Sequence, residues 1–344
     1  MLGIDISPTA INMLEMTHDK SRYCVTGYGR WVLPEQVIDH GIIKKMDIVA
    51  HGIKTLFASA GLSAKNAVLA VPDSSTISKI IQVHHSLSEQ DIEELVTIEA
   101  IKYMPDLTHD IHVDFTIVGP SPDQLDMHDV RLIATRAENV TQRVEVVRLA
   151  GLDTKIVDVE SFAIERVGER LALDSSSFEP LQRIAIFDLG LVYTHFHVLD
   201  GAKMVFSHAD AFGGKQLIHS MAQQYGVGPH DAIVAIEKGS LPNKDVAVFL
   251  QSVQELLLLQ LKRSLHLFLS SNPQSTVGKL VLAGSLAKFP GLAHVLQAQF
   301  NIPTSVLNPF AQMSFAQSIN RQAIMNDAPM LLVACGLALR VLNG

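Results

Sequence analysis

The sequence has few of the features that would mark a secreted, nucleic-acid-binding or membrane protein. Its two cysteines, Cys24 and Cys335, provide neither a disulfide framework nor a metal-ligand spacing, and indicate buried thiols in a reducing compartment. The net charge of −8 argues against general binding to nucleic acid or anionic lipid. Asp5 interrupts the first apolar stretch, and the apolar run 329–339 is too short to span a bilayer. We therefore expect a cytoplasmic protein without direct membrane insertion.

Length and an internal repeat predict two lobes. At about 150 residues per domain, 344 residues correspond to two domains. The predicted strand RIAIFDLG (183–190) is similar in sequence to the opening strand LGIDIS (2–7). Each copy has an Asp beside small residues near its end. The repeat predicts a duplicated α/β fold with a site between the halves. We place the first lobe at 1–178 and the second at 183–325, with a helix at 328–344 packing back on the first lobe.

The stretch 83–154 is expected to form a small α/β insert within the first lobe. Ser88 and Asp91 are typical of a capping box at the start of a helix, and a strand at 111–117 alternates apolar and polar residues. The stretch has fourteen acidic and five basic residues, a net charge of −9. It is either a solvated acidic surface or an acidic rim around an apolar groove for a basic peptide. For the second reading the candidate partner-binding residues are Glu89, Glu93 and Glu94.

Four short segments have the chemistry of a Mg-nucleotide site. Two are Asp-bearing turns, at 5–9 and 188–194, where carboxylates can hold a metal and backbone N–H groups can hold phosphates. A Gly-Gly pair at 213–214 opens a helix and could present N–H donors to an anion. A fourth, Ala283-Gly284-Ser285, ends a strand where the backbone could pass close to a base. Each signal alone is more typical of an ordinary turn, but the four in this order favour a nucleotide site.

The order of these loops resembles the actin-like superfamily, which includes FtsA and MreB. Longer blocks resemble the PilM family of type IV pilus assembly proteins: GIDISPTAINMLEM (3–16), IEAIKYMPDLTHDIHVDFTIVGPS (98–121), AGLDTKIVDVESFAIER (150–166), AFGGKQL (211–217), LNPFAQM (307–313) and NDAPMLLVACGLALR (326–340). The resemblance implies an actin-like (ribonuclease H-like) duplicated fold with a nucleotide cleft, in which the insert is a 1C-like subdomain.

The resemblance also implies ATP and Mg as cofactors, with Asp5 and Asp188 at the metal, directly or through water. The residues implied to hold ATP are Asp5, Ser7, Thr9, Asp188, Gly190, Thr194, Gly213, Gly214, Lys215, Gly284 and Ser285. Glu160, at the start of a helix, is implied to activate water as a general base. The alternative is an ordinary acidic residue favoured by the helix dipole.

Several residues depart from the family pattern at this site. Asn12 stands where a Lys is common, Pro8 removes one backbone donor, and Leu191-Val192-Tyr193 is bulkier than usual. The stretch 232–236 lacks the Glu that contacts the nucleoside, and leaves Lys238 as the nearest cation. The pattern is compatible with nucleotide binding but predicts at most slow ATPase activity, and whether ATP is hydrolysed stays open.

The function implied by the resemblance is a nucleotide-binding scaffold at the inner membrane. Its implied partners are the N-terminal cytoplasmic tail of PilN, the PilN/PilO platform and pilus motor proteins, and a homo-oligomeric ring or filament stays open. Two alternatives come from other classes. A small-molecule kinase shares the duplicated architecture but needs an acceptor motif, which we do not find. An FtsA-like filament protein would carry an amphipathic tail, whereas the sequence given stops at Gly344 after an apolar helix.

Overall fold

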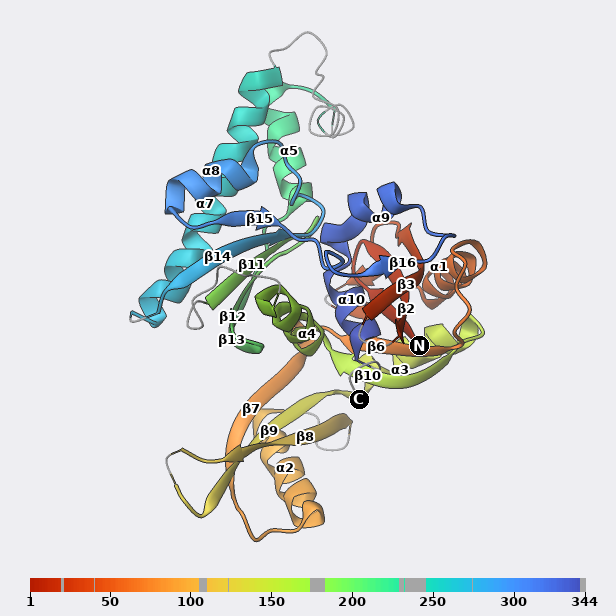
Figure 1. Ribbon diagram of the computed structural model, residues 1–344, viewed down its shortest axis with the longest axis vertical. Coiled ribbons are helices and arrows are strands. Elements are labelled where there is room, and N and C mark those ends of the chain that lie inside the picture. Colours follow the sequence, from red (N-terminus) through yellow and green to blue (C-terminus); the bar gives the residue numbers. More distant parts are fainter. Residues whose placement is uncertain are drawn as a thin grey trace.

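The fold is built on two large β-sheets with helices between them and on their outer faces (Figure 1). The computed structural model describes residues 1–19, 22–39, 41–104, 110–122, 124–173, 183–228, 232, 246–273 and 275–340. The sequence predicts a linker at the segment DSSSFEP (174–180) and a helix at 230–238. Both lie outside the described residues, apart from Ala232.

The first sheet contains the N-terminal strands. Its order is β10 (Asp153–Val159), β6 (Asn66–Val71), β1 (Leu2–Ile6), β2 (Ala10–Asp19), β3 (Arg22–Val32) and β16 (Ser314–Phe315). All five residues of β1 are buried, as expected for a strand covered on both faces. Helices α1 (Met46–Ser59) and α3 (Ala137–Leu149) pack with it in one apolar core.

The second sheet has the order β13 (Lys203–Asp210), β12 (Thr194–Asp200), β11 (Arg183–Leu189), β14 (Val277–Ala283) and β15 (Thr304–Val306). Its outer face packs against α5 (Gly214–Tyr225), α7 (Val246–Ser271) and α8 (Leu292–Phe300). Helix α7 buries an apolar stripe that recurs every three or four residues, the spacing of one helix face. The stripe consists of Phe249, Val253, Leu257, Leu261, Leu265 and Phe268.

The two sheets repeat one topology. In the first, β3, β2 and β1 are antiparallel neighbours, and β6 and β10 follow in parallel. In the second, β13, β12 and β11 are antiparallel, and β14 and β15 follow in parallel. The predicted duplication is confirmed. The sequence also predicts a tight turn at Asp200-Gly201, and a turn at Gly201 and Ala202 joins β12 to β13 there.

Helices α4 (Glu160–Leu173) and α10 (Leu332–Leu339) form the layer between the sheets, in an apolar core that takes side chains from both. Their backbones meet closely: a Cβ added at Gly336 of α10 would lie 1.9 Å from the Ala163 carbonyl oxygen of α4. A Cβ added at Gly3 of β1 would lie 2.5 Å from the Ala334 carbonyl oxygen. Glycine at 336 and 3 therefore lets α10 rest directly on α4 and β1.

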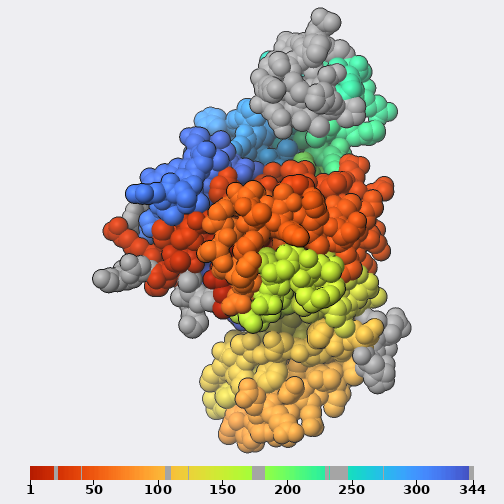
Figure 2. Space-filling model, turned by 90° about the vertical axis from the view of Figure 1, so that its right-hand side faces the viewer, coloured from red at the N-terminus to blue at the C-terminus, as the bar shows by residue number. Residues whose placement is uncertain are grey.

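The insert has a sheet of its own, in the order β7 (Thr76–His84), β9 (Met127–Arg136) and β8 (Ile111–Pro120). Helix α2 (Glu89–Tyr103) covers one face, and Ser88 and Asp91 form the expected capping box. This body starts seven residues before the expected boundary at 83, and α3, expected in the insert, packs in the first-lobe core instead. In Figure 2 the insert projects from the lower end of the molecule.

Short elements complete the fold: β4 (Ile38–Asp39), β5 (Ile42–Ile43), η1 (Asp73–Ser75), α9 (Arg321–Asp327) and η3 (Ala328–Met330). The C-terminal helix expected at 328–344 is broken at Leu331, between η3 and α10. Within the described residues no single helix is long and apolar enough to cross a membrane. The helices 321–330 and 332–339 meet that criterion only as a pair bent by 99°.

Candidate functional site

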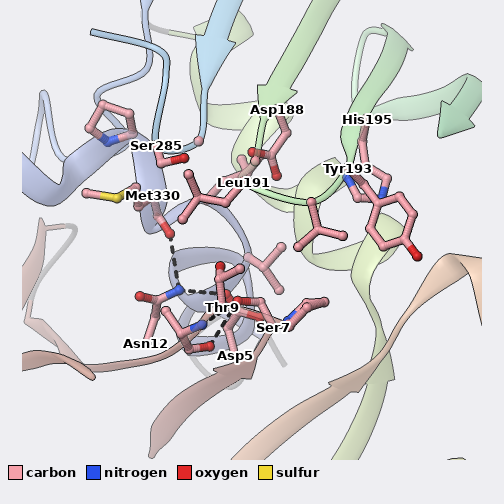
Figure 3. A pocket seen from close by; sticks show the side chains of 18 of the residues that line it. Asp5, Ser7, Thr9, Asn12, Asp188, Leu191, Tyr193, His195, Ser285 and Met330 are labelled. Carbon is pink, nitrogen blue, oxygen red and sulfur yellow. Dashed lines mark hydrogen bonds between the residues drawn. The ribbon is translucent and has the colours of Figure 1, made fainter. Parts of the chain in front are cut away.

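Strand alternation directs the two aspartates into the cleft between the sheets, where they lie on opposite walls (Figure 3). Successive side chains of a strand point to opposite faces. Asp5 therefore shares its face of β1 with Gly3, which rests on α10. Asp188 shares its face of β11 with Ile184 and Ile186, which belong to the core between the lobes. The two repeated strands thus present their carboxylates to one cavity.

The first loop is a tight turn held by Ser7. The Ser7 backbone N–H donates to the Ala10 carbonyl oxygen at 3.0 Å, and the Ser7 hydroxyl donates to the same oxygen at 2.9 Å. Beside the turn, Asn12 Nδ2 donates to Asp5 Oδ2 at 2.9 Å and to the Met330 carbonyl oxygen at 3.3 Å. Asn12 Oδ1 is buried without a partner among the described residues. This orphaned oxygen lies next to Asp5, at the wall of the cavity.

The second loop rests on the N-terminus of α5. The Gly190 N–H donates to the Tyr193 carbonyl oxygen at 3.0 Å, which closes the loop. The N–H groups of Gly214 and Lys215 donate to the carbonyl oxygens of Gly190 at 3.0 Å and Leu191 at 2.8 Å. The helix N-terminus expected to bind an anion therefore holds the second loop in place. A phosphate could use these donors only after displacing the loop.

The third loop requires a glycine. Gly284 has φ +83°, and a Cβ there would lie 2.5 Å from Asp188 Oδ1 and 2.6 Å from the Leu189 carbonyl oxygen. Its N–H donates to the Pro329 carbonyl oxygen at 2.8 Å, and the Ser285 hydroxyl donates to the Leu189 carbonyl oxygen at 3.3 Å. The third loop is thus held against both the second loop and the segment before α10.

The structure brings most of the expected ATP-binding residues to one cavity, of about 120 Å³. Those that line it are Asp5, Ser7, Thr9, Asp188, Gly190, Gly284 and Ser285. Those that do not line it are Thr194, which is 2 % exposed at the start of β12, and Gly213, Gly214 and Lys215 around the start of α5.

Burial shapes the electrostatics of the cavity. Desolvation raises the pKa of Asp5 to about 6, with a further contribution from the charge of Asp188. Desolvation also raises the pKa of Asp188 to about 6. At neutral pH two mostly ionised carboxylates therefore face one another in a poorly hydrated space. A cation between them would relieve this cost.

These groups fit a Mg²⁺ ion that comes with a nucleotide. Mg²⁺ prefers oxygen ligands and is usually held by one or two carboxylates together with substrate phosphates. Asp5, Asp188 and the orphaned oxygen of Asn12 provide oxygen atoms of that kind. In the described part of the chain no group of three or more His, Cys, Asp or Glu side chains could hold a metal ion. The site thus suits a metal whose coordination the phosphates complete.

A whole nucleotide needs more room than this cavity, since such ligands occupy pockets of about 300–1,000 Å³. A wider cleft of about 570 Å³ adjoins it, and Pro8, Val192 and Tyr193 line both. An ion pair between Lys215 Nζ and Glu35 Oε1, 2.9 Å apart, crosses this cleft from lobe to lobe. A nucleotide would therefore have to extend from the aspartate cavity into this cleft, past the segment 191–193 and the Lys215–Glu35 ion pair.

A second cavity, of about 210 Å³, contains Glu160. Burial raises the pKa of Glu160 well above its usual value, and the charges of Asp73 and Asp5 add to this effect. Asp73 also accepts a hydrogen bond from the Ser161 N–H, at 3.2 Å, at the start of α4. The positive charge of Arg143, which lines the same cavity, lowers the pKa of Glu160 but does not outweigh burial. Burial therefore favours the protonated form of Glu160 over the carboxylate that a general base needs.

Sequence reasoning missed Arg143 and His195 as site residues. Arg143 belongs to α3 and lies within 83–154, where the sequence indicates only its contribution to the net charge of the predicted insert. His195 pairs with Asp188 across β11 and β12 and lines both cavities, and burial lowers its pKa. The pairing of β11 with β12 could have revealed His195, since a residue opposite a site aspartate shares its face.

A third cavity, of about 440 Å³, forms a groove between the insert and α4. We call it the insert groove; it is lined by Thr116, Ile117, Val118, Arg131, Phe162, Glu165, Arg166, Glu169, Ala202 and Arg340. Arg131 crosses it, with Nη1 3.6 Å from Glu165 Oε2 and its guanidinium 5.3 Å from the Phe162 ring centre. Ile117 and Val118 are 46 % and 47 % exposed there. The insert groove combines apolar surface with charges of both signs.

The expected partner-binding residues Glu89, Glu93 and Glu94 do not line the insert groove. They are exposed on α2, which packs on the insert-sheet face that carries Val130 and Leu132. Arg131, between those two residues, points to the other face, where the groove lies. The structure thus separates the acidic α2 surface from the groove.

The duplicated sheets, the facing aspartates and the cleft between the lobes define a protein of the actin-like ATPase fold. Similar solved structures have that fold. A chain of a "PilM-PilN type IV pilus biogenesis complex" superposes with a TM-score of 0.80 at 24 % identity, covering 98 % of this chain and 97 % of that one. The ethanolamine utilization protein EutJ from Carboxydothermus hydrogenoformans superposes at 0.56 with 14 % identity, covering 98 % and 88 %.

A model of the family "Type IV pilus assembly protein PilM" matches residues 3–342, nearly the whole chain. The chain therefore belongs to the PilM family, and the resemblance read from its sequence is confirmed.

Proposed function

We propose that this chain is a Mg-ATP-binding scaffold of the type IV pilus machinery that holds the N-terminal tail of PilN in its insert groove. The observation that carries the proposal is the groove itself, in a chain of the PilM family. A similar chain is solved as a PilM-PilN complex, which supports PilN as the partner. PilN would then keep the scaffold at the cytoplasmic side of the inner membrane, beside the PilN/PilO platform.

The chemistry of the insert groove suits an extended peptide. The exposed Ile117 and Val118 offer apolar contacts at one wall. Arg166 at the other wall is fixed, since its Nε donates to the Gly336 carbonyl oxygen at 2.8 Å and its guanidinium pairs with Asp158. Such a groove can take apolar anchors from a peptide and pair its charged side chains.

We expect Val118→Asp to lower the affinity for a synthetic peptide of the PilN N-terminal tail by about tenfold. The change places a carboxylate on an exposed apolar contact of the groove, and an uncompensated contact of this kind costs about 1–3 kcal/mol on binding. Fluorescence anisotropy with a labelled peptide measures the effect.

The matched control is Glu94→Lys, on the acidic surface of α2. It should change the peptide affinity by less than about twofold, because exposed charges contribute little to binding at physiological salt. If Glu94→Lys abolished binding and Val118→Asp left it unchanged, the peptide site would lie on α2 and not in the groove.

ATP turnover is expected to be slow, well below the median enzyme value of about 10 per second. Two features support this: Asn12 stands where a Lys is common in the family, and burial raises the pKa of Glu160, which favours its protonated form. Phosphate release at saturating Mg-ATP measures the rate. A rate of several per second that Glu160→Ala abolished would show that the site is an efficient ATPase.

A further inference from the structure

Helix α2 carries apolar and acidic side chains together on its outer face. Ile98 is 64 % exposed, and Glu94 and Leu95 lie four and three residues before it. Side chains at these spacings are neighbours on a helix surface. The helix has five acidic residues and one basic residue, Lys102, which pairs with Glu99. Within the described residues Glu94 has no ion-pair partner, so this face is negative around an apolar centre.

Helix α7 carries the opposite combination on the face away from its buried stripe. Leu259 is 67 % exposed, and Lys262 and Arg263 follow it at three and four residues. Neither cation has an ion-pair partner in the described part of the chain. The one acidic residue of the helix, Glu255, accepts a hydrogen bond from Gln251 Nε2 at 3.0 Å. This face therefore has a net positive charge around an apolar centre.

The two faces are complementary. Ile98 and Leu259 are the most exposed large apolar side chains on the described helices. The charges around them differ in sign over whole subdomains: residues 76–136 include eleven acidic and four basic side chains, net −7, whereas 183–325 include seven acidic and ten basic, net +3. An apolar centre with a charged rim, facing a rim of the opposite sign, is typical of protein–protein contacts.

We propose that the outer face of α2 docks on the outer face of α7 in a second copy of this chain. Ile98 would then pack against Leu259, with Glu94 beside Arg263. The two faces belong to different parts of one molecule, since Figure 1 shows α2 at its lower end and α7 in its upper half. A contact between two different faces is heterologous, so each added copy leaves one free face of each kind and the assembly grows into a ring or a filament.

This contact goes beyond the proposed function and does not depend on it. Helix α2 covers the insert-sheet face that carries Val130 and Leu132, whereas the insert groove lies on the other face with Arg131. One copy can therefore hold a peptide in the groove and a neighbouring copy on α2 at the same time.

The first experiment follows the full chain by sedimentation velocity as its concentration is raised at low salt. We expect species larger than a dimer, and fewer of them at high salt, because exposed charges are screened over about 8 Å at physiological ionic strength. A chain that stays monomeric throughout would overturn the proposal.

The second experiment removes one apolar centre at a time. Ile98→Asn and Leu259→Asn should each weaken association at least about tenfold, because each leaves a polar group in a contact that excludes water. Mixed in equal amounts, the two variants should form a heterodimer that grows no further, since one intact α2 face then meets one intact α7 face. The control is Leu125→Asn, a fully exposed apolar position between β8 and β9, which should associate like the parent.

The third experiment reverses the charges. Glu94→Lys and Arg263→Glu should each weaken association several-fold, and a chain with both changes should associate more strongly than either single variant. Equal melting temperatures of all variants and the parent show that they fold. If only the α2 variants weakened association, or if the mixture of Ile98→Asn and Leu259→Asn stayed monomeric, the two faces would not meet and the proposal would fail. Affinities for Mg-ATP and for the PilN peptide, measured separately, decide the proposed function.

Discussion

Asp188→Asn is expected to weaken Mg-ATP binding at least tenfold and to stabilise the nucleotide-free protein at neutral pH. The loss of affinity follows from removing one of the two carboxylates that face the proposed metal position, since a charge-assisted contact contributes about 1.5–3 kcal/mol. The gain in stability follows from removing a charge that burial disfavours. Calorimetry and thermal melting measure the two effects.

The pH dependence of the melting temperature tests the second effect. The pKa of Asp188 rises from 3.8 to about 6 on folding, so its contribution to stability is fully present below pH 3.8 and is lost as pH rises through about 6. Melting temperatures of the parent and Asp188→Asn should therefore agree near pH 4, separate as pH rises to about 6, and differ by a constant amount above that.

The control is Asp153→Asn, at an exposed position of β10, which should leave Mg-ATP affinity unchanged. Equal Mg-ATP affinity of Asp188→Asn and the parent would show that this carboxylate does not face the metal.

Gly336→Ala is expected to lower the free energy of unfolding by about 3 kcal/mol or more. The new Cβ would lie 1.9 Å from the Ala163 carbonyl oxygen and 2.4 Å from its carbonyl carbon. Because both are backbone atoms, α10 would have to move away from α4, and such overpacking costs about 1–3 kcal/mol or more. Urea denaturation at 25 °C measures the change.

Gly151→Ala is the matched control, since it adds the same methyl group in open space. Nothing lies within 4 Å of that position, and its φ of +83° costs a non-glycine residue only about 1–2 kcal/mol. If the two variants were equally stable, the close contact of α10 and α4 would not be a determinant of stability.

Much of the fold could be predicted because the chain repeats itself. The strand–Asp–turn motif occurs twice, and side-chain alternation along β1 and β11 fixes the face that carries each aspartate. Because the two sheets face each other, the side chains of Asp5 and Asp188 line the same cavity. The Ser88 capping box and α5 were likewise predictable, because both depend on local sequence.

The remaining features depend on contacts between distant segments. Arg143 reaches the second cavity because α3 packs in the first lobe beside Gly41, about 100 residues earlier in the chain. The insert groove needs Val118, Phe162 and Arg340, which local patterns do not connect. The N–H groups at the N-terminus of α5 donate hydrogen bonds to the carbonyl oxygens of Gly190 and Leu191. The sequence of the helix does not indicate these partners, because they come from the second loop.

Helices α4 and α10 each extend from the cleft between the lobes to the insert groove. Helix α4 begins with Glu160 at the second cavity and carries Phe162 and Arg166 in the insert groove. The segment leading into α10 lines the aspartate cavity with Met330, and its other end reaches the groove at Arg340. The backbones of the two helices are in close contact, so a displacement of one would require the other to move. A ligand that shifts the pair makes the two sites allosterically coupled, and linkage then requires nucleotide and peptide to change each other's affinity by the same factor.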